Sequence, residues 1–272
     1  MGQGVIWYTG QFYAQSFLEN TVKIEFMQNR EILLWGIGLA TPFFLVFGAL
    51  SDRIGRKWIM LTGMLLGVLF YRPIFNTFLK DANPAAWMND GANISREPGG
   101  AKFTRDTIKV NDHMQFVNKR ETIFSYNGNR FTERSTDTTD LPGNTLGDAQ
   151  IVGAARKGKP VYSDVVLSSA LQWKFTFLVW CMIIFVTMAY APIAAFLVEL
   201  FPTRIRYTSM SLPYHIGNGV FGGLVPFIAT LLSTSFANDP LVGLWYPIAV
   251  AALCFVIGAV YLSNKIDQNI ND

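Results

Sequence analysis

Four runs of the sequence carry no charged residue and are long enough to cross a lipid bilayer: 32–50, 175–198, 207–238 and 241–264. A bilayer core of about 30 Å is crossed by a helix of roughly 20 apolar residues. Residues 58–78 add a similar run whose one charge is Arg72, and residues 4–18 add a shorter one. A soluble domain of this length does not need so many uncharged runs of this length.

We therefore expect six membrane spans, at residues 4–18, 32–50, 58–78, 175–198, 209–233 and 241–263. All six should be helices, because a lone strand would leave backbone groups unpaired in lipid. The predicted fold class is an all-α membrane protein in contact with a lipid bilayer. The only cysteines, Cys181 and Cys254, fall inside predicted spans and indicate neither a disulfide nor a metal framework.

The distribution of lysine and arginine predicts the orientation, because short cytoplasmic loops are enriched in both. By helix count, the loops after the second and fourth spans lie on one side of the membrane. These two loops hold the basic residues Arg53, Arg56, Lys57, Arg204 and Arg206. The opposite short loops hold only Lys23 and Arg30. Both basic loops and both termini are thus expected on the cytoplasmic side of the plasma (inner) membrane.

Residues 80–169 interrupt the membrane part and hold more than half of the charged residues. The expected domains are therefore spans one to three at 1–79, an extracytoplasmic insertion at 80–169, and the remaining spans with a cytoplasmic tail at 170–272. The insertion is predicted to be small and β-rich, or partly disordered.

The strongest local signal in the insertion is Asn127-Gly128 between alternating segments 122–126 and 130–133, which predicts a β-hairpin. Short strands are also expected at residues 107–110 and 115–117. The Ser/Thr/Asp-rich run 135–140 is predicted to be flexible. Glycine and proline predict loops at residues 98–100, 141–143 and 158–160.

The loop between the second and third spans reads Gly48-Ala-Leu-Ser-Asp52-Arg53-Ile-Gly55-Arg56-Lys57. Gly48 would let helices approach, and Gly55 would adopt backbone angles that other residues avoid. Asp52 could accept hydrogen bonds from the N-terminus of a neighbouring helix. The three basic side chains would anchor the loop in the cytoplasm and pair with carboxylates. A generic basic loop explains the charge but not the order of these residues.

This string resembles the signature loop of the major facilitator superfamily in its G-x-L-S-D-R-x-G-R-K form. Glu199 and Arg206, separated by six residues, resemble the E-x6-R pattern found in that family after the fourth helix of a half. The resemblance implies a cytoplasmic gate in which Glu199 pairs with Arg53 or Arg56 and Arg206 joins the same network. Segments 3–13 and 201–212 are most similar to the metabolite:proton symporters, the group of proline/betaine and organic-acid transporters.

The family has twelve spans in two six-helix halves, and the pattern here resembles the C-terminal half, helices seven to twelve. The resemblance does not cover the insertion. We expect this six-helix half to need a separate N-terminal half, or a second copy, to transport by alternating access.

Polar residues within the predicted spans are candidates for a substrate or proton path. Gln3, Trp7, Gln11 and Gln15 recur every four residues along one broad face, and Tyr8 flanks it. Amides facing lipid are costly, so this face should line a cavity or contact another helix.

The fifth span places Tyr214, His215 and Asn218 among glycines and prolines, which predicts a bent or partly unwound helix. His215 could carry a proton, or could be a neutral residue bonded to a neighbouring helix. Arg72 could snorkel to the outer interface or attract an anion from inside a cavity. Weaker candidates are Tyr190 and Trp35.

The resemblance implies the C-terminal half of a secondary active transporter, with proton-coupled symport of a small organic acid or zwitterionic metabolite. The alternative is a non-transporting membrane sensor that uses the insertion as its ligand-binding head. The sequence has no His-Glu-x-x-His, Gly-x-Ser-x-Gly or P-loop motif, which argues against an enzyme. No cofactor, metal or nucleic-acid partner is expected.

Overall fold

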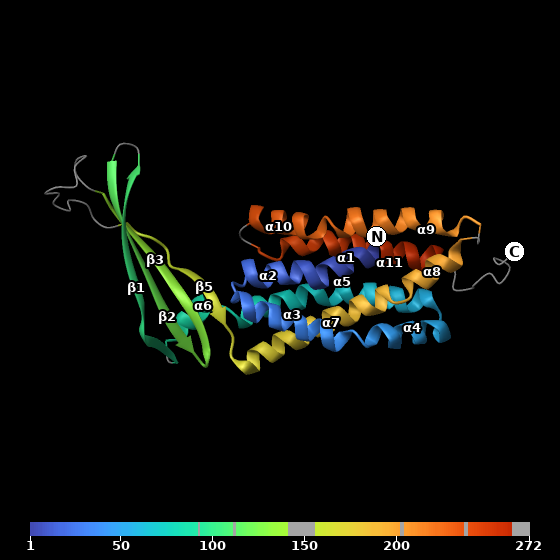
Figure 1. Cartoon of the computed structure of the whole chain (residues 1–272), viewed down its shortest axis with the longest axis horizontal. Helices are drawn as coiled ribbons and strands as arrows, with labels where there is room; N and C mark the ends of the chain where they lie inside the picture. The colour runs from blue at the N-terminus through green and yellow to red at the C-terminus, as the bar shows by residue number, and fades with distance from the viewer. Residues whose placement is uncertain (92, 111–112, 141–155, 202–203, 237–238, 263–272) are drawn as a thin grey trace. The chain divides into compact units, whose positions relative to one another are not determined.

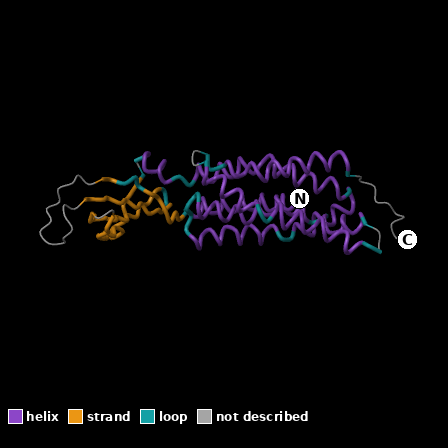
Figure 2. The backbone as a smooth tube through the Cα atoms, turned by 90° about the horizontal axis from the view of Figure 1, so that it is seen from above, coloured by secondary structure: helices purple, strands orange, loops and turns teal. Residues whose placement is uncertain are grey.

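The computed structural model describes the whole chain except residues 92, 111–112, 141–155, 202–203, 237–238 and 263–272. The chain divides into two compact units. The first comprises Met1–Thr21, Asn29–Asp81 and Leu171–Asp272 and is helical, and the second comprises Val22–Gln28 and Ala82–Ala170 and is built on a β-sheet (Figure 2).

The helices of the first unit run side by side along one common direction (Figure 1). Its first half contains α1 (Gly2–Tyr8), the π-helix η1 (Thr9–Tyr13), α2 (Ala14–Asn20), α3 (Phe26–Ala40), α4 (Phe43–Ile54) and α5 (Arg56–Asp81). Its second half contains α7 (Ser169–Tyr190), α8 (Ile193–Leu200), α9 (Arg206–His215), the π-helix η2 (Ile216–Gly222), α10 (Val225–Ser235), η3 (Val242–Leu244) and α11 (Trp245–Tyr261).

Five helical stretches among the described residues are long and apolar enough to cross a membrane: Phe26–Ile54, Arg56–Asp81, Ser169–Leu200, Arg206–Ser235 and Val242–Tyr261. Four of the five contain a predicted span and extend beyond it at both ends, whereas Val242–Tyr261 lies within the span predicted at 241–263. The prediction of six spans is not met, because α1, η1 and α2 together do not reach the length and hydropathy of the other five. The chain is an integral membrane protein.

The outer surface of the helical unit carries large apolar side chains that a soluble protein would bury. Leu34, Leu45 and Val260 are each at least 70% exposed. Lipid can cover such residues, whereas water would favour polar ones. The inside of the unit contains a row of buried aromatic rings, including Phe75 between Phe17 and Phe78 at centroid distances of 4.9 and 5.9 Å.

Gly63 marks a close approach of two backbones. A Cβ atom added to Gly63 of α5 would lie 2.7 Å from both the Ala189 nitrogen and the Phe185 carbonyl oxygen of α7. Small residues allow membrane helices to approach in this way. Gly48 was predicted to serve this purpose, but an added Cβ atom there meets nothing within 4 Å. The prediction for Gly48 is therefore wrong, and the contact glycine lies on the next helix.

We expect Gly63→Ala to destabilise the helical unit by about 1–3 kcal/mol, because the methyl group would overlap the α7 backbone. The matched control, Gly48→Ala, should be neutral or stabilising by about 0.5–1 kcal/mol, because alanine favours a helix. Thermal unfolding in detergent compares the two variants. Equal effects of the two substitutions would contradict the assigned approach.

The second unit contains α6 (Pro84–Asp90) and the strands β1 (Ile94–Val110), β2 (His113–Tyr126), β3 (Asn129–Asp140), β4 (Arg156–Lys157) and β5 (Val161–Val166). The strands form an antiparallel sheet in the order β1-β2-β3-β4, and β5 also pairs with β3. The predicted β-rich insertion is thus present as a small sheet. Its compact unit begins at Ala82 and also includes Val22–Gln28, which the sequence did not indicate.

The predicted hairpin joins β2 to β3 through Asn127 and Gly128. Both residues have positive φ, at 48° and 78°, and Tyr126 pairs with Asn129 across the turn. A two-residue turn of this kind favours Asn-Gly because both positions require positive φ.

The other predictions for the insertion meet mixed outcomes. Residues 135–140 belong to β3 rather than to a flexible run, because they pair with β2 residue by residue. Residues 98–100 lie within β1 as an irregularity in its pairing, not as a loop. Residues 158–160 lack regular structure, as expected, and residues 141–143 lie outside the described part of the chain. The predicted strands at 107–110 and 115–117 lie inside β1 and β2.

Aromatic packing stabilises one region of the sheet. Phe131 of β3 is 1% exposed and lies 5.7 Å from the Trp87 ring of α6, which also stacks on Tyr126 at 5.6 Å. Phe124 stacks on Phe131 at 5.8 Å. A short helix therefore supplies the ring that covers this part of the sheet.

Candidate functional site

A single residue, Gly55, separates α4 from α5. Its φ of 96° and ψ of 138° lie in a region that a side chain makes unfavourable. The tight turn predicted at this glycine is therefore present. It sets the last turn of α4 directly beside the first residue of α5.

Arg56, the first residue of α5, contacts two carboxylates. Its Nη2 atom lies 3.3 Å from Asp52 of α4 and forms an ion pair with Glu199 of α8. The side chain of Arg56 is 15% exposed, and those of Glu199 and Asp52 are 28% and 65% exposed. The expected contact between Glu199 and an arginine of the loop is thus made by Arg56. It joins segments more than 140 residues apart.

The burial of Arg56 makes its ion pair with Glu199 important for stability. Its Nε and Nη1 atoms are buried and have no hydrogen-bond partner within the described ranges. A buried guanidinium is costly unless an anion compensates it, so the half-buried Glu199 matters more than the exposed Asp52. Asp52 was expected to accept from the N-terminus of a neighbouring helix, and it instead pairs with Arg56 one turn along the chain.

Lys57 connects the same turn to the end of α11. Its ammonium group donates to the carbonyl oxygens of Ala259 and Leu262, at 2.9 and 2.7 Å. The last carbonyl groups of a helix lack partners within it and carry partial negative charge, so a lysine there is stabilising. Lys57 was expected to anchor the loop in the cytoplasm and to pair with a carboxylate, and it donates instead to backbone carbonyl oxygens. The α4–α5 turn therefore holds both α8 and α11.

The remaining residues of the predicted gate lie apart from this cluster. The Arg206 Nε atom donates to the Phe201 carbonyl oxygen at 3.0 Å, so in the described part of the chain Arg206 caps its own loop instead of joining the network. Arg53 and Arg204 are exposed. The structure thus brings together Asp52, Arg56 and Glu199, and leaves Arg206 outside.

Four helices of the membrane unit are interrupted part-way along. Proline ends regular helix between α3 and α4 at Pro42 and between α7 and α8 at Pro192. The π-helices η1 and η2 interrupt the first and fifth helical stretches. Such wide turns are frequent at functional sites. The fifth span, predicted to be bent or partly unwound, departs from regular α-helix at η2 and at the turn residues Gly223 and Leu224 that follow it.

Aromatic residues next to several of these interruptions lie close together. The Trp7 ring of α1 lies 4.6 Å from Tyr190 and 6.4 Å from Phe44, and Tyr190 and Phe44 are 6.3 Å apart. The Tyr190 hydroxyl also shares a hydrogen bond with the Tyr214 hydroxyl. We call Trp7, Phe44, Tyr190 and Tyr214 the aromatic cluster. Phe44 was not among the predicted residues.

The N-terminal helix also packs closely on η2. The Gln3 amide nitrogen donates to the Asn218 side-chain oxygen at 2.6 Å. A Cβ atom added to Gly4 would lie 2.7 Å from the Gly217 carbonyl oxygen. The predicted polar face of the first helix therefore serves, at this end, as contact between helices. The Gln3 side-chain oxygen is buried without a partner in the described chain.

Three other candidates lie on or beside the same predicted face. Tyr8 stacks on Phe12 at 5.2 Å, and the Gln15 amide lies against the Arg30 guanidinium. Gln11 is half-buried.

His215 and Arg72 also differ from expectation. The exposed His215 ring bonds to the Ser211 carbonyl oxygen of its own helix at 2.7 Å, not to a neighbouring helix. Arg72 forms an ion pair with Asp239 at 3.2 Å and lies over the Trp245 ring at 5.0 Å. Both residues thus have partners that the sequence did not indicate, and these contacts do not decide between the roles expected of them.

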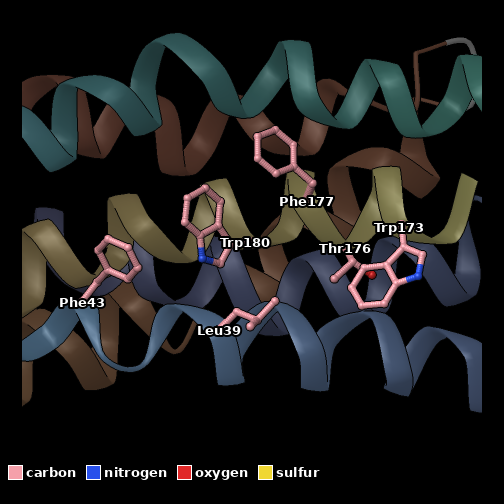
Figure 3. A pocket seen from close by; sticks show the side chains of 6 residues that line it. All are labelled: Leu39, Phe43, Trp173, Thr176, Phe177 and Trp180. Carbon is pink, nitrogen blue, oxygen red and sulfur yellow. The ribbon is translucent and has the colours of Figure 1, made fainter. Parts of the chain in front are cut away.

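A hollow of about 390 Å³ lies between α3, α4 and α7. Figure 3 shows the side chains that line it, namely Leu39, Phe43, Trp173, Thr176, Phe177 and Trp180. Trp35, which was a weak path candidate, contacts Trp173 at 6.1 Å. The only hydroxyl of the lining, on Thr176, already donates to the Gln172 carbonyl oxygen at 2.9 Å. This hollow suits apolar groups, and besides Thr176 its lining carries only the indole N–H groups of Trp173 and Trp180 as hydrogen-bonding groups.

Part of the chain is similar to two curated proteins. A Haemophilus influenzae protein named as a metabolite transport protein is 36% identical over 81 residues, which is 30% of this chain and 17% of that protein. The inner membrane metabolite transport protein YhjE of Escherichia coli is 36% identical over 69 residues, 25% of this chain and 15% of that protein. The matches thus span about a sixth of these relatives. No family profile and no solved structure matches the chain.

We expect Gly55→Val to destabilise the protein by about 1–3 kcal/mol, because a β-branched residue is strained at this φ and ψ. The measurement is the thermal unfolding midpoint in detergent. The variant should also weaken the ion pair of Arg56, seen as a smaller effect of a second substitution at Glu199. Unchanged stability would show that the turn does not require glycine.

We expect Glu199→Gln to lower the free energy of unfolding by about 1.5–3 kcal/mol, because a buried guanidinium loses its anion. Asp52→Asn should cost only about 0.2–1 kcal/mol, because Asp52 is exposed and solvent screens its pair. Denaturant unfolding of the two variants in the same detergent measures the order. A larger effect at Asp52 than at Glu199 would refute this ranking.

Proposed function

We propose that this chain is the C-terminal half of a secondary active transporter of the major-facilitator type. The single observation that carries the proposal is the position of Arg56, buried between Asp52 and Glu199 where α4, α5 and α8 end. The membrane spans and the similarity to two proteins named for metabolite transport support it. Those names favour a transporter over the sensor alternative.

In this proposal the cluster at Arg56 is a gate at the cytoplasmic ends of the helices. An ion pair between distant segments holds one arrangement of α5 and α8, and its separation allows another. Breaking the pair costs about 1.5–3 kcal/mol, because Arg56 is largely buried, and contacts made only in the other arrangement would have to offset that cost. The gate would then be the part of the chain that differs between the two states of alternating access.

The aromatic cluster is the proposed lining of the path for substrate. Tyr190 and Tyr214 present hydroxyl groups beside the Trp7 ring at helix interruptions. An interruption can shift more easily than a continuous helix, and such positions line sites in transporters. A small organic acid or zwitterion taken up with protons fits hydroxyl partners of this kind. A second six-helix half, or a second copy, would supply the opposing wall.

The proposed activity is tested by uptake into membrane vesicles from the native host, in which any partner half is present. Radiolabelled small organic acids and zwitterions are compared between wild type and a strain lacking this chain. We expect uptake of at least one compound that falls several-fold on deletion and again when a protonophore collapses the proton gradient. Glu199→Gln should slow this uptake, whereas Arg53→Gln should change it little.

Each outcome has a distinct meaning. Uptake that ignores the proton gradient would remove proton coupling but leave transport. Equal uptake with and without the chain, across the whole panel, would overturn the transporter proposal. A Glu199→Gln variant that is inserted in the membrane and transports at the wild-type rate would refute the gate.

A further inference from the structure

β1 is an open edge of the sheet in the second unit. The sheet order places β1 at one end, with β2 on one side. Among the described residues, no strand pairs with its other side. From Ala101 to Val110 it pairs with β2 without irregularity, so its outer backbone groups form a regular row. Such a row is a template for another strand.

On the opposite side of the sheet, the strand β5 is covered by another segment of the chain. There β5 is bridged by the segment Val22–Gln28, in which Ile24 lies beside Val165 in parallel. The Glu25 nitrogen donates to the Val165 carbonyl oxygen, and the Val165 nitrogen donates to the Lys23 carbonyl oxygen, both at 2.9 Å. The chain thus covers its short edge strand and leaves the long one open.

The first part of β1 carries two backbone features that discourage pairing. Pro98 lacks an N–H group, and Gly99 has a φ of 77° where the register with β2 shifts. Proline and bulges commonly protect an edge strand. The regularly paired part of β1 begins at Ala101, beyond these two residues. Its open edge is about ten residues long, which exceeds the length of many complete strands.

We propose that this edge pairs with the same edge of a second copy of the chain, antiparallel, with Thr104 opposite its own equivalent. In that register Lys102 lies opposite Asp106 of the copy, and Asp106 lies opposite Lys102 of the copy. Phe103 likewise lies opposite Arg105. Directly opposed residues project to the same face, so both pairs can form twice.

The side chains on this edge suit that arrangement. Asp106 already lies 2.9 Å from Lys119 of β2, so Lys102 of the copy would complete an alternation of charges. Phe103 is 59% exposed, and the Arg105 guanidinium lies 5.3 Å from the Phe116 ring. A second aromatic face would extend this cation–π contact.

Other registers are less favourable, which makes the proposal specific. Centred on Arg105, the pairing would place two arginines directly opposite each other. Centred on Asp106, it would place two aspartates directly opposite each other. Like charges directly opposite are destabilising. Only the register centred on Thr104 combines the attractive pairs with no opposed like charges among these residues.

Cysteine cross-linking tests the register in the full chain, in lipid nanodiscs or detergent. Cys181 and Cys254 are first replaced by alanine, and Thr104→Cys is then compared with Arg120→Cys. Arg120 lies on β2, paired on both sides, and serves as the matched control. Opposed Cα atoms lie close enough for a disulfide, so we expect about tenfold more cross-linked dimer from Thr104→Cys.

A pair of charge variants tests the complementarity. Lys102→Asp gives an edge with two acidic positions, and Asp106→Lys gives one with two basic positions. Each alone should associate at least about fivefold more weakly than wild type, because like charges oppose. Mixed together with different tags, the two variants should pair with each other, since both opposed positions then attract.

Each result either supports or overturns the proposed pairing of the two β1 edges. Cross-linking at Thr104 together with recovery in the mixture supports the proposal. A monomeric wild-type chain overturns it, as does a dimer in which Thr104→Cys cross-links no better than Arg120→Cys. Failure of the mixture to recover association overturns the register. None of these results depends on transport, so the proposed function stands or falls separately.

Discussion

The ion pair between Arg56 and Glu199 holds the ends of the membrane helices. A buried guanidinium must have an anion, and the anion here comes from a helix far along the chain. Gly55 makes this possible, because its unusual backbone angles start α5 with Arg56 beside the end of α4. Lys57 then reaches the final carbonyl groups of α11. Gly55, Arg56 and Lys57 therefore hold the start of α5 against the ends of α4, α8 and α11.

The parts of the fold that the sequence predicted are those whose physical requirements are local. The membrane spans were visible because lipid requires long apolar helices with their backbones paired. The hairpin was visible because Asn127 and Gly128 both take positive φ. The first span was overestimated, since residues 4–18 are apolar but short and form a helix interrupted by η1. The strand at 135–140 was missed, because its polar composition resembles a loop and pairing with β2 decides its structure.

The candidate site was predictable in its local part and not in its distant contacts. The string from Gly48 to Lys57 indicated a tight turn, and the resemblance indicated a partner in Glu199. The partners of Lys57 on α11 are backbone carbonyl groups, which leave no signature in a sequence. Arg72 and Asp239 lie 167 positions apart, and their pairing follows from how α5 packs beside α11. Phe44 was missed as well, because its contacts with Trp7 and Tyr190 depend on how α4 packs beside α1 and α7.

A double-mutant cycle between Arg56 and Glu199 tests the central claim most directly. The free energy of unfolding in detergent is measured for the wild type, Arg56→Gln, Glu199→Gln and the double variant. The structure predicts a coupling energy of about 1–3 kcal/mol, because the two side chains are in direct contact and partly buried. Additive effects, with a coupling near zero, would show that the two residues do not hold the helix ends together.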